Sequence, residues 1–365
     1  MRTGLEAPAK RPRISILVPA WHRPDLTAKC IASLQTQSIG DHYEVIVIEN
    51  DAESGPIWMG SEPHNVRRLL LPRNYGFAGA INRGLEVCAG EYILLLNNDV
   101  QLHRDFLQTL EAHLQAQPQL AFAVGKLLCA NDKARLDGAG DAMLLGGGVY
   151  RLGHQDLDSG QFEEPREVLA GCGACLLVKR AGLEVAGGLD ENFFAYLEDA
   201  DVSLRLCLAG YSGLYVPTAV AFHLGSATLG SPVHPTIIRW MTRNQIFLLM
   251  KNYPLPVLVR LLPRIAIYQL LWFVLSVKRG ALIAYLAGLA EAILALPKML
   301  RQQSRIMRVK KISDRDFLDL LRQSEQQIYE WHQQRSPESR AALLKIYFWI
   351  FGSPATVTAR RQSQT

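Results

Sequence analysis

Short apolar runs alternate with longer amphipathic segments along the first third of the chain. The runs lack the polar alternation of half-exposed strands, so they predict strands that are buried on both faces. The segments between them repeat apolar residues at helical spacing. This alternation predicts an α/β fold, with a mostly parallel sheet and helices on both of its faces. The predicted strands are residues 14–18, 43–48, 65–71 and 92–96, and the predicted helices are 26–34, with Asp25 as N-cap, 77–88 and 105–114.

Polar residues follow three of the predicted strands. They form the clusters Pro19-Ala20-Trp21, Glu49-Asn50-Asp51 and Asn97-Asn98-Asp99. Because residues just past the carboxyl ends of parallel strands line the ligand crevice, we expect the clusters to share one edge of the sheet. Carboxylates and amides at such an edge suit a hard divalent cation, Mg²⁺ or Mn²⁺, that bridges phosphates. Asn-Asn-Asp is also common turn chemistry, so the third cluster alone leaves a structural role open.

The alternation of apolar runs and helical segments ends in the middle of the chain. Residues 120–180 are rich in glycine and predict strands and loops rather than another strand–helix unit. A helix opens with the acidic run Glu198-Asp199-Ala200-Asp201. The elements predicted after residue 168 are a buried strand at 169–179, helices at 180–186 and 196–208, short strands at 213–216 and 220–223, and a basic and apolar helix at 237–252.

Further residues carry candidate chemistry. Asp199, beside Glu198, can act as a general base, or the two can be helix acids that face the macrodipole. His223 can complete a metal site with Asp99, or it can be a structural histidine. The small residues of segment 74–84 allow a nucleotide to approach the backbone, and the helix that follows favours phosphate, although tight packing would need the same residues.

The last third of the chain is apolar and basic. Residues 253–300 contain one acid, Glu291, and their uncharged runs, 265–277 and 280–290, are shorter than a bilayer requires. Six basic residues and no acid lie between 297 and 311. The pattern predicts a peripheral anchor on an anionic membrane surface. The alternatives are a helical subdomain packed on the core and a dimer surface. We expect residues 351–365 to form a disordered polar tail.

Composition narrows the class of protein. The chain has 365 residues, 49% of them apolar and 20% charged, which excludes disorder along its whole length. The net charge is +5, and because much of the excess lies in 298–311, it points to a membrane surface rather than to nucleic acid. The six cysteines are scattered, and the pair Cys172 and Cys175 predicts buried residues rather than a zinc site. No apolar signal segment opens the chain, so we expect a cytoplasmic protein with reduced thiols.

Taken together, these motifs resemble family-2 inverting glycosyltransferases of the GT-A fold, in particular the bacterial branch described as rhamnosyltransferase-like. The resemblance covers roughly residues 12–255. It implies a catalytic domain at 12–252 and a separate helical region at 253–350. The stretches that carry it are 16–21, 45–50, 74–84, 94–100, 187–201 and 223–228, with Arg243-Asn244 after them.

The resemblance implies a role for each matching residue. Asp199 would be the catalytic base, with Glu198 beside it. Asp99 would be the carboxylate ligand of the divalent metal, and His223 would contact the metal or the diphosphate. Asn97 stands where the family has the first Asp of its DxD motif. Glu49 stands where the family usually has Asp, and Ala52 and Ser54 replace the serine and aspartate that often follow. The residues implied to bind the nucleotide-sugar donor are Pro19, Ala20, Trp21, Glu49, Asn50, Gly79, Asn82, Asn97, Asn98 and Arg243.

The implied reaction is a single displacement that inverts the anomeric carbon. The metal stabilises the departing nucleoside diphosphate, and Asp199 removes the proton from the acceptor hydroxyl. The branch favours dTDP-rhamnose as donor and a glycan or polyprenyl-diphosphate-linked acceptor, at the inner face of the cell membrane, in cell-surface polysaccharide synthesis. The alternatives are UDP-galactofuranose or a UDP-hexose as donor, or a degenerate domain without catalysis. The sequence leaves a homo-oligomer possible.

Overall fold

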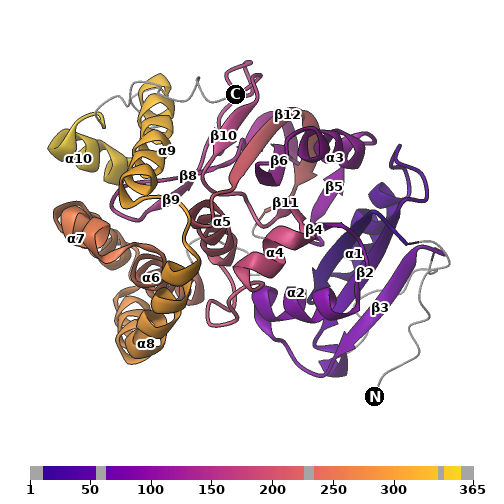
Figure 1. The fold of residues 1–365 in the computed structure, drawn as a ribbon, viewed down its shortest axis with the longest axis horizontal. Coiled ribbons are helices and arrows are strands. Elements are labelled where there is room, and N and C mark those ends of the chain that lie inside the picture. The colour runs from indigo at the N-terminus through magenta and orange to yellow at the C-terminus, as the bar shows by residue number, and fades with distance from the viewer. Residues whose placement is uncertain (1–10, 55–62, 226–233, 336–340, 355–365) are drawn as a thin grey trace.

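The computed structural model describes residues 11–54, 63–225, 234–335 and 341–354 (Figure 1). Of the tail predicted at 351–365, residues 355–365 lie outside these ranges, as do the motif residues 226–228, and Phe351 ends a helix instead of opening the tail. A ten-stranded mixed sheet organises the described part of the chain. Eight strands follow the order β10-β12-β6-β11-β4-β1-β2-β3, and the other two pair beside it, β5 with β12 and β7 with β6. Its strands are β1 (Ile14–Ala20), β2 (Tyr43–Asn50), β3 (Val66–Leu71), β4 (Tyr92–Leu96), β5 (Val100–Leu102), β6 (Leu120–Cys129), β7 (Asp132–Gly138), β10 (Arg166–Val168), β11 (Cys175–Lys179) and β12 (Ser212–His223).

The four N-terminal strands of the sheet run parallel, as the sequence predicts. β1 pairs with both β2 and β4, and β3 extends the same parallel set at the edge. β11 is antiparallel to both of its neighbours, β4 and β6, and joins this half to the parallel pair β6 and β12. The carboxyl ends of β1, β2 and β4 therefore meet at one edge, where the polar clusters lie.

Helices cover both faces of the sheet, and the alternation of side chains along β1 assigns them. Ile14, Ile16 and Val18 belong to the core that packs against the helices α1 and α3. Leu17 belongs to the core on the opposite face, beneath α2, α4 and α5. Because both faces are covered, every position of β1 is apolar or small, which explains the uninterrupted run in the sequence. These helices are α1 (Pro24–Leu34), α2 (Gly76–Val87), α3 (Phe106–Ala116), α4 (Arg180–Ala186) and α5 (Glu198–Leu208), and a short 3-10 helix spans Ala52–Ser54.

Some element boundaries differ from the sequence predictions. The predicted N-cap Asp25 lies inside α1, and the cap position is held by Arg23 in the left-handed region, because Pro24 begins the helix. Glu49 and Asn50 belong to β2 rather than following it. The two short strands expected near 213 and 220 are one strand, β12, with a register shift between Val216 and Val220. The strand predicted from residue 169 begins only at β11.

Among the described residues, the helices α6 to α10 follow the sheet and pack beside it (Figure 1). One hydrophobic core contains Met143 and Leu145, from the small hairpin β8–β9, together with residues of all four helices α6 to α9. The inner face of the helical region is therefore packed on the part of the chain that carries the sheet, while the predicted boundary at residue 252 stays a prediction. The elements are β8 (Asp141–Met143), β9 (Val149–Arg151), α6 (Pro235–Asn252), α7 (Leu255–Lys278), α8 (Leu282–Val309), α9 (Asp314–Gln334) and α10 (Ala342–Phe351).

The prediction that no segment is long enough to span a membrane is wrong. By length and composition, α7 and α8 could each cross one, and only 28% and 22% of their apolar stretches are buried. The charges that interrupt the apolar runs turn inward: Arg264 pairs with the buried Glu325, and Glu291 pairs with Arg243. Counting uncharged runs therefore underestimates the apolar length of the outer face. Two such helices are weak evidence for membrane association.

Candidate functional site

The turn after β4 brings Asp99 beside His223, which ends β12. The Nε2 atom of His223 lies 3.4 Å from Oδ1 of Asp99, and its Nδ1 atom lies 2.7 Å from Oδ2 of Asp137. Burial lowers the pKa of His223, but hydrogen bonds and the charges of the two carboxylates outweigh it and raise this pKa to about 9. Carboxylate oxygen and imidazole nitrogen are suitable ligands for Mn²⁺ or Mg²⁺. A ring nitrogen ligates a cation only without its proton, so a divalent cation held by this pair would have to displace a proton from His223.

The two asparagines before Asp99 shape its turn. The backbone N–H of Asn97 donates to the carbonyl of Ala174 at 2.9 Å. The side chain of Asn98 donates to the hydroxyl of Thr27 on α1 at 3.0 Å. Asn98 therefore fastens the turn to a helix, whatever further role it has toward a donor.

Asp199 lies in the first turn of α5. Its Oδ2 accepts a hydrogen bond from the backbone N–H of Gly173, and its Oδ1 accepts one from Ala200, both at 2.7 Å. Burial raises the pKa of Asp199, although these two donors oppose the shift. The pKa of Glu198 is raised further, by burial and by the charge of Asp199. The raised pKa makes both carboxylates stronger bases than ordinary ones, which suits a group that receives a proton.

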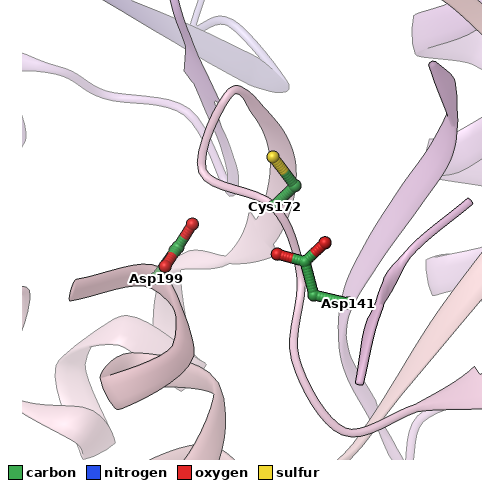
Figure 2. Close-up of side chains that lie close together, drawn as sticks. All are labelled: Asp141, Cys172 and Asp199. Atoms are coloured by element: carbon green, nitrogen blue, oxygen red, sulfur yellow. The ribbon is translucent and has the colours of Figure 1, made fainter. Parts of the chain in front are cut away.

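The loop 172–174 joins the two candidate centres. Gly173 donates to the carboxylate of Asp199, and the next residue, Ala174, accepts from Asn97 in the Asp99 turn. Figure 2 shows the side chains of Asp141, Cys172 and Asp199 gathered around this loop. Their ligand atoms lie within 4.8 Å of one another.

Sequence reasoning missed the charged residues of the glycine-rich stretch that complete this centre. Arg151 donates to Asp137 at 2.6 Å and to the sulfur of Cys172 at 2.7 Å, and its Nε lies 3.8 Å from Asp141. A guanidinium thus already supplies positive charge beside the cluster in Figure 2, which disfavours a second cation there. The signal in the sequence was the pair Asp137 and Asp141 in an otherwise apolar, glycine-rich stretch.

The carboxyl of Asp141 has fewer positive or hydrogen-bonding partners than that of Asp137 or Asp199. Burial raises its pKa to about 7 despite the charge of Arg151, and the charges of Asp199 and Asp137 add to the shift. Its Oδ1 atom is buried and makes no hydrogen bond among the described residues. The carboxyl is therefore neutral or half-ionised near neutral pH.

The residues expected to hold the nucleotide lie along the edge formed by β1, β2 and α2. Pro19 and Ala20 end β1, and the indole N–H of Trp21, next in sequence, is buried and makes no hydrogen bond among the described residues. Glu49 is buried and pairs with Arg68 on β3. A donor would have to share the Glu49 carboxylate with that arginine.

The remaining expected residues make contacts inside the protein. Asn50 donates to the carbonyl of Gly76 at 3.1 Å and so fixes the loop before α2. Asn82 exchanges hydrogen bonds with the backbone of Leu189, at 2.8 and 3.0 Å. A Cβ at Gly79 would lie 2.9 Å from the Cβ of Tyr75, which is the tight packing that the sequence left open. The binding roles predicted for these residues stay predictions.

Arg243 lies on α6, well away in sequence from the other expected donor residues. Its Nη2 donates to the carbonyl of Phe193 at 2.7 Å, and its Nη1 lies 3.2 Å from Glu291. The guanidinium therefore fastens the turn that precedes α5, and its predicted contact with the donor stays a prediction.

The model of the family "Glycosyl transferase family 2" matches residues 15–186. These residues form a family-2 glycosyltransferase domain. The match ends before Asp199 and His223. These two residues are assigned only from the resemblance of the motifs at 187–201 and 223–228. The recognition made from the sequence motifs is thereby confirmed.

Curated relatives agree with this family. The O-antigen biosynthesis protein RfbC of Myxococcus xanthus is 26% identical over 240 residues, which are 63% of this chain and 19% of the relative. The N-acetylglucosaminyl-diphospho-decaprenol L-rhamnosyltransferase of Mycobacterium tuberculosis is 29% identical over 181 residues, which are 44% of this chain and 59% of the relative. The chain thus spans between a fifth and three fifths of these relatives.

The solved structures agree on the fold. GalNAc-T7, crystallised with UDP, GalNAc and Mn²⁺, is 13% identical and aligns with a TM-score of 0.55 over 80% of this chain and 54% of its own. Such a likeness shows the fold alone. The chain has the GT-A fold, with a mixed, mostly parallel sheet and additional C-terminal helices.

Proposed function

We propose that the protein transfers a sugar from a nucleotide diphosphate to an acceptor hydroxyl, with inversion at the anomeric carbon. One observation carries the proposal: adjacent residues of one loop fasten both candidate centres. Gly173 holds the carboxylate of Asp199, and Ala174 holds the turn that carries Asp99. An inverting displacement needs a base and a leaving-group site at a fixed separation, on opposite faces of the sugar.

The chain's residues divide the work of this reaction. Asp99 and His223 would hold a divalent cation, which when bound would neutralise charge on the diphosphate. Asp199 accepts the proton of the attacking hydroxyl, and its raised pKa brings its basicity closer to that task. The donors Gly173 and Ala200 fix the orientation of its carboxylate. No general acid is required, because a cation-bound diphosphate leaves as an anion.

We favour dTDP-rhamnose as donor, because the Mycobacterium tuberculosis relative is named as an L-rhamnosyltransferase. UDP-galactofuranose or a UDP-hexose remains the alternative. The test is a screen of purified protein against nucleotide sugars, with and without Mn²⁺ or EDTA. We expect cation-dependent hydrolysis or transfer that is greatest with dTDP-rhamnose. Preference for a UDP sugar would overturn the donor, and absence of turnover with every nucleotide sugar would overturn the proposed activity.

We further propose that the protein lies on the cytoplasmic face of the cell membrane and acts on a glycan or a polyprenyl-diphosphate-linked acceptor. The outer faces of α7 and α8 support this location. Ile283 and Leu294 are 85% and 81% exposed, and the exposed bases Lys278 and Arg279 lie at the end of α7. Apolar side chains beside basic ones suit an anionic bilayer surface.

The membrane proposal is tested with anionic vesicles made of phosphatidylglycerol and phosphatidylethanolamine. Replacing both Ile283 and Leu294 with Glu should abolish sedimentation of the protein with the vesicles. The control is Leu157→Glu, on the catalytic part, which is 58% exposed and should leave sedimentation unchanged. Equal sedimentation of the double variant and the wild type would contradict the proposed location.

A further inference from the structure

The turn before the proposed base has a strained backbone. Phe194, Tyr196 and Leu197 have φ angles of 64°, 70° and 68°, in the left-handed region that residues with a Cβ rarely adopt. Three such residues within four positions persist only where the surrounding structure holds them. Strain of this kind collects at functional sites, so the side chains that this turn presents are candidates for a role in binding.

A buried asparagine on α6 holds the turn in place. The amide nitrogen of Asn244 lies 3.0 Å from the carbonyl oxygen of Phe193, 2.9 Å from that of Ala195 and 2.7 Å from that of Tyr196. Asn244 is completely buried. Its neighbour Arg243 donates to the carbonyl of Phe193 as well. The arrangement fixes the turn by its backbone, while Phe193 and Leu197 pack into the core and Tyr196 stays exposed.

The turn presents aromatic rings beside one from α6. The ring centroid of Trp240 lies 5.1 Å from that of Phe194 and 6.2 Å from that of Tyr196. Tyr196 is 38% exposed, which is high for an aromatic residue held in a strained turn. It precedes Asp199 by three residues. Burial, together with the charges of Glu198 and Asp99, raises the pKa of the Tyr196 phenol.

We propose that Tyr196 and Trp240 form a shelf on which a pyranose ring of the acceptor stacks in front of Asp199. The proposal rests on the proposed transferase activity and names the acceptor-binding surface of the same site. The C–H face of a sugar ring packs on aromatic rings, and its hydroxyls need polar partners at the edge. Two charged residues offer such partners: Arg239, which precedes Trp240 in sequence, and Glu291, whose Oε1 accepts from Nε of Arg239 at 2.6 Å.

The position of Trp240 favours the acceptor over the donor. The polar clusters for the nucleotide end β1, β2 and β4, and the carbonyl of Phe194 accepts from Ala78 near the start of α2, so the turn itself borders the donor side. Trp240 belongs to α6, which lies on the other side of α5, next to α8 (Figure 1). An acceptor must contact the base on the face of the sugar opposite the diphosphate. The shelf adjoins α8, so the lipid of a membrane-linked acceptor would continue along the apolar helices.

The test compares Trp240→Ala with Trp240→Phe, which keeps an aromatic face. The control is Trp349→Ala on α10, a tryptophan that is 85% exposed. The probes are octyl glycosides of glucose, galactose, rhamnose and N-acetylglucosamine. Binding is measured by calorimetry, and transfer from the preferred nucleotide sugar is measured separately. We expect Trp240→Ala to raise both the Kd and the acceptor KM on the order of tenfold, because one stacking surface is lost.

The donor readouts separate the shelf from the transferase activity itself. The donor KM and the hydrolysis of the donor should not change in Trp240→Ala, and Trp240→Phe and Trp349→Ala should bind the glycoside like the wild type. The shelf is overturned if the wild type binds no glycoside, if Trp240→Ala binds as well as the wild type, or if the donor KM rises instead. If Trp240→Ala loses glycoside binding while the wild type consumes no nucleotide sugar, the transferase proposal fails and a sugar-binding shelf stands.

Discussion

Two groups of buried charge meet at the loop 172–174, and they are built in opposite ways. The first is a chain of alternating charge, in which His223 lies between Asp99 and Asp137, and Asp137 also accepts from Arg151. Despite burial, the charge of Arg151 and the hydrogen bond from His223 hold the pKa of Asp137 well below its usual range. Each charge in this group has a partner, so the group keeps a fixed charge.

The second group consists of the carboxyls Glu198, Asp199 and Asp141. Burial raises the pKa of all three, and their mutual repulsion adds to the shift of each of Glu198 and Asp141. The raised pKa makes each of these carboxylates a stronger base than an ordinary one. The difference shows how one loop can separate two tasks: the paired charges fix the position of Asp99, and the carboxyls with a raised pKa suit proton transfer.

The largest expected effect is a loss of turnover when the second group of carboxyls loses Asp199. Asp199→Asn keeps the size of the side chain but cannot accept the proton, so kcat should fall on the order of a thousandfold. The Kd of the nucleotide sugar, measured with Mn²⁺ by calorimetry, should not change, because the donor lies on the other side of the loop. Normal turnover by this variant would remove Asp199 as the base.

Disrupting the first group, in which His223 and Arg151 pair with Asp99 and Asp137, should lower the stability of the protein. Arg151→Met removes the cation between Asp137 and Asp141 and should lower the free energy of unfolding by about 3–5 kcal/mol, measured in urea, because buried carboxylates lose their partner. The control is Arg135→Met, whose exposed pair with Asp132 should be worth about 0–1 kcal/mol. Equal losses in the free energy of unfolding would mean that Arg151 stabilises the protein no more than an exposed ion pair does.

The turn that carries the base should respond more moderately. Asn244→Ala leaves the carbonyls of Ala195 and Tyr196 without their amide donor, while Phe193 keeps the one from Arg243, and should cost about 1–3 kcal/mol in stability. Because the strained turn relaxes, kcat should also fall while the donor KM stays constant. Gln269→Ala removes an amide hydrogen bond to Gln245 elsewhere on α6 and serves as the control. A loss of stability with unchanged kcat would show that the clamp does not position the base.

The smallest effect is a pH dependence of stability. The pKa of Asp141 is about 7 in the folded protein and near that of an ordinary carboxyl, 3.8, when unfolded. The stability that the neutral carboxyl provides is therefore complete below pH 3.8 and is lost as the pH rises through 7. Urea midpoints measured between pH 5 and 8 should fall less steeply in Asp141→Asn than in the wild type. Parallel curves, matching those of the exposed control Asp132→Asn, would contradict the raised pKa.

The sequence predicted the fold where the periodicity is local. The run that ends at Leu96 and the turn residues up to Asp99 specify a buried strand and its exit, so Asp99 could be assigned to the edge of the sheet. His223 could be assigned because it closes an apolar strand. The pairing of His223 with Asp99 follows from β12 and β5, which are antiparallel neighbours far apart in sequence.

The rest of the site depends on contacts that no local pattern shows. Arg151 lies on β9, a three-residue strand without apolar alternation, and pairs there with the strand that carries Asp141. The strain at Tyr196 is a property of the backbone, imposed by Asn244 from another helix. The outer apolar face of α8 was underestimated because Glu291, which breaks the run in the sequence, turns toward the protein.

The hairpin β8–β9 sets a lower limit on the portion of the chain that can be produced as a working enzyme. Its backbone is held from the far end of the sequence: Met143 donates to the hydroxyl of Ser324 on α9 at 2.7 Å, and Gly146 donates to that of Tyr347 on α10 at 3.2 Å. This hairpin carries both Asp141 and Arg151. A fragment trimmed to the family-matched region would lose that backing, so expression, crystallisation and chimera design should keep the chain through α10.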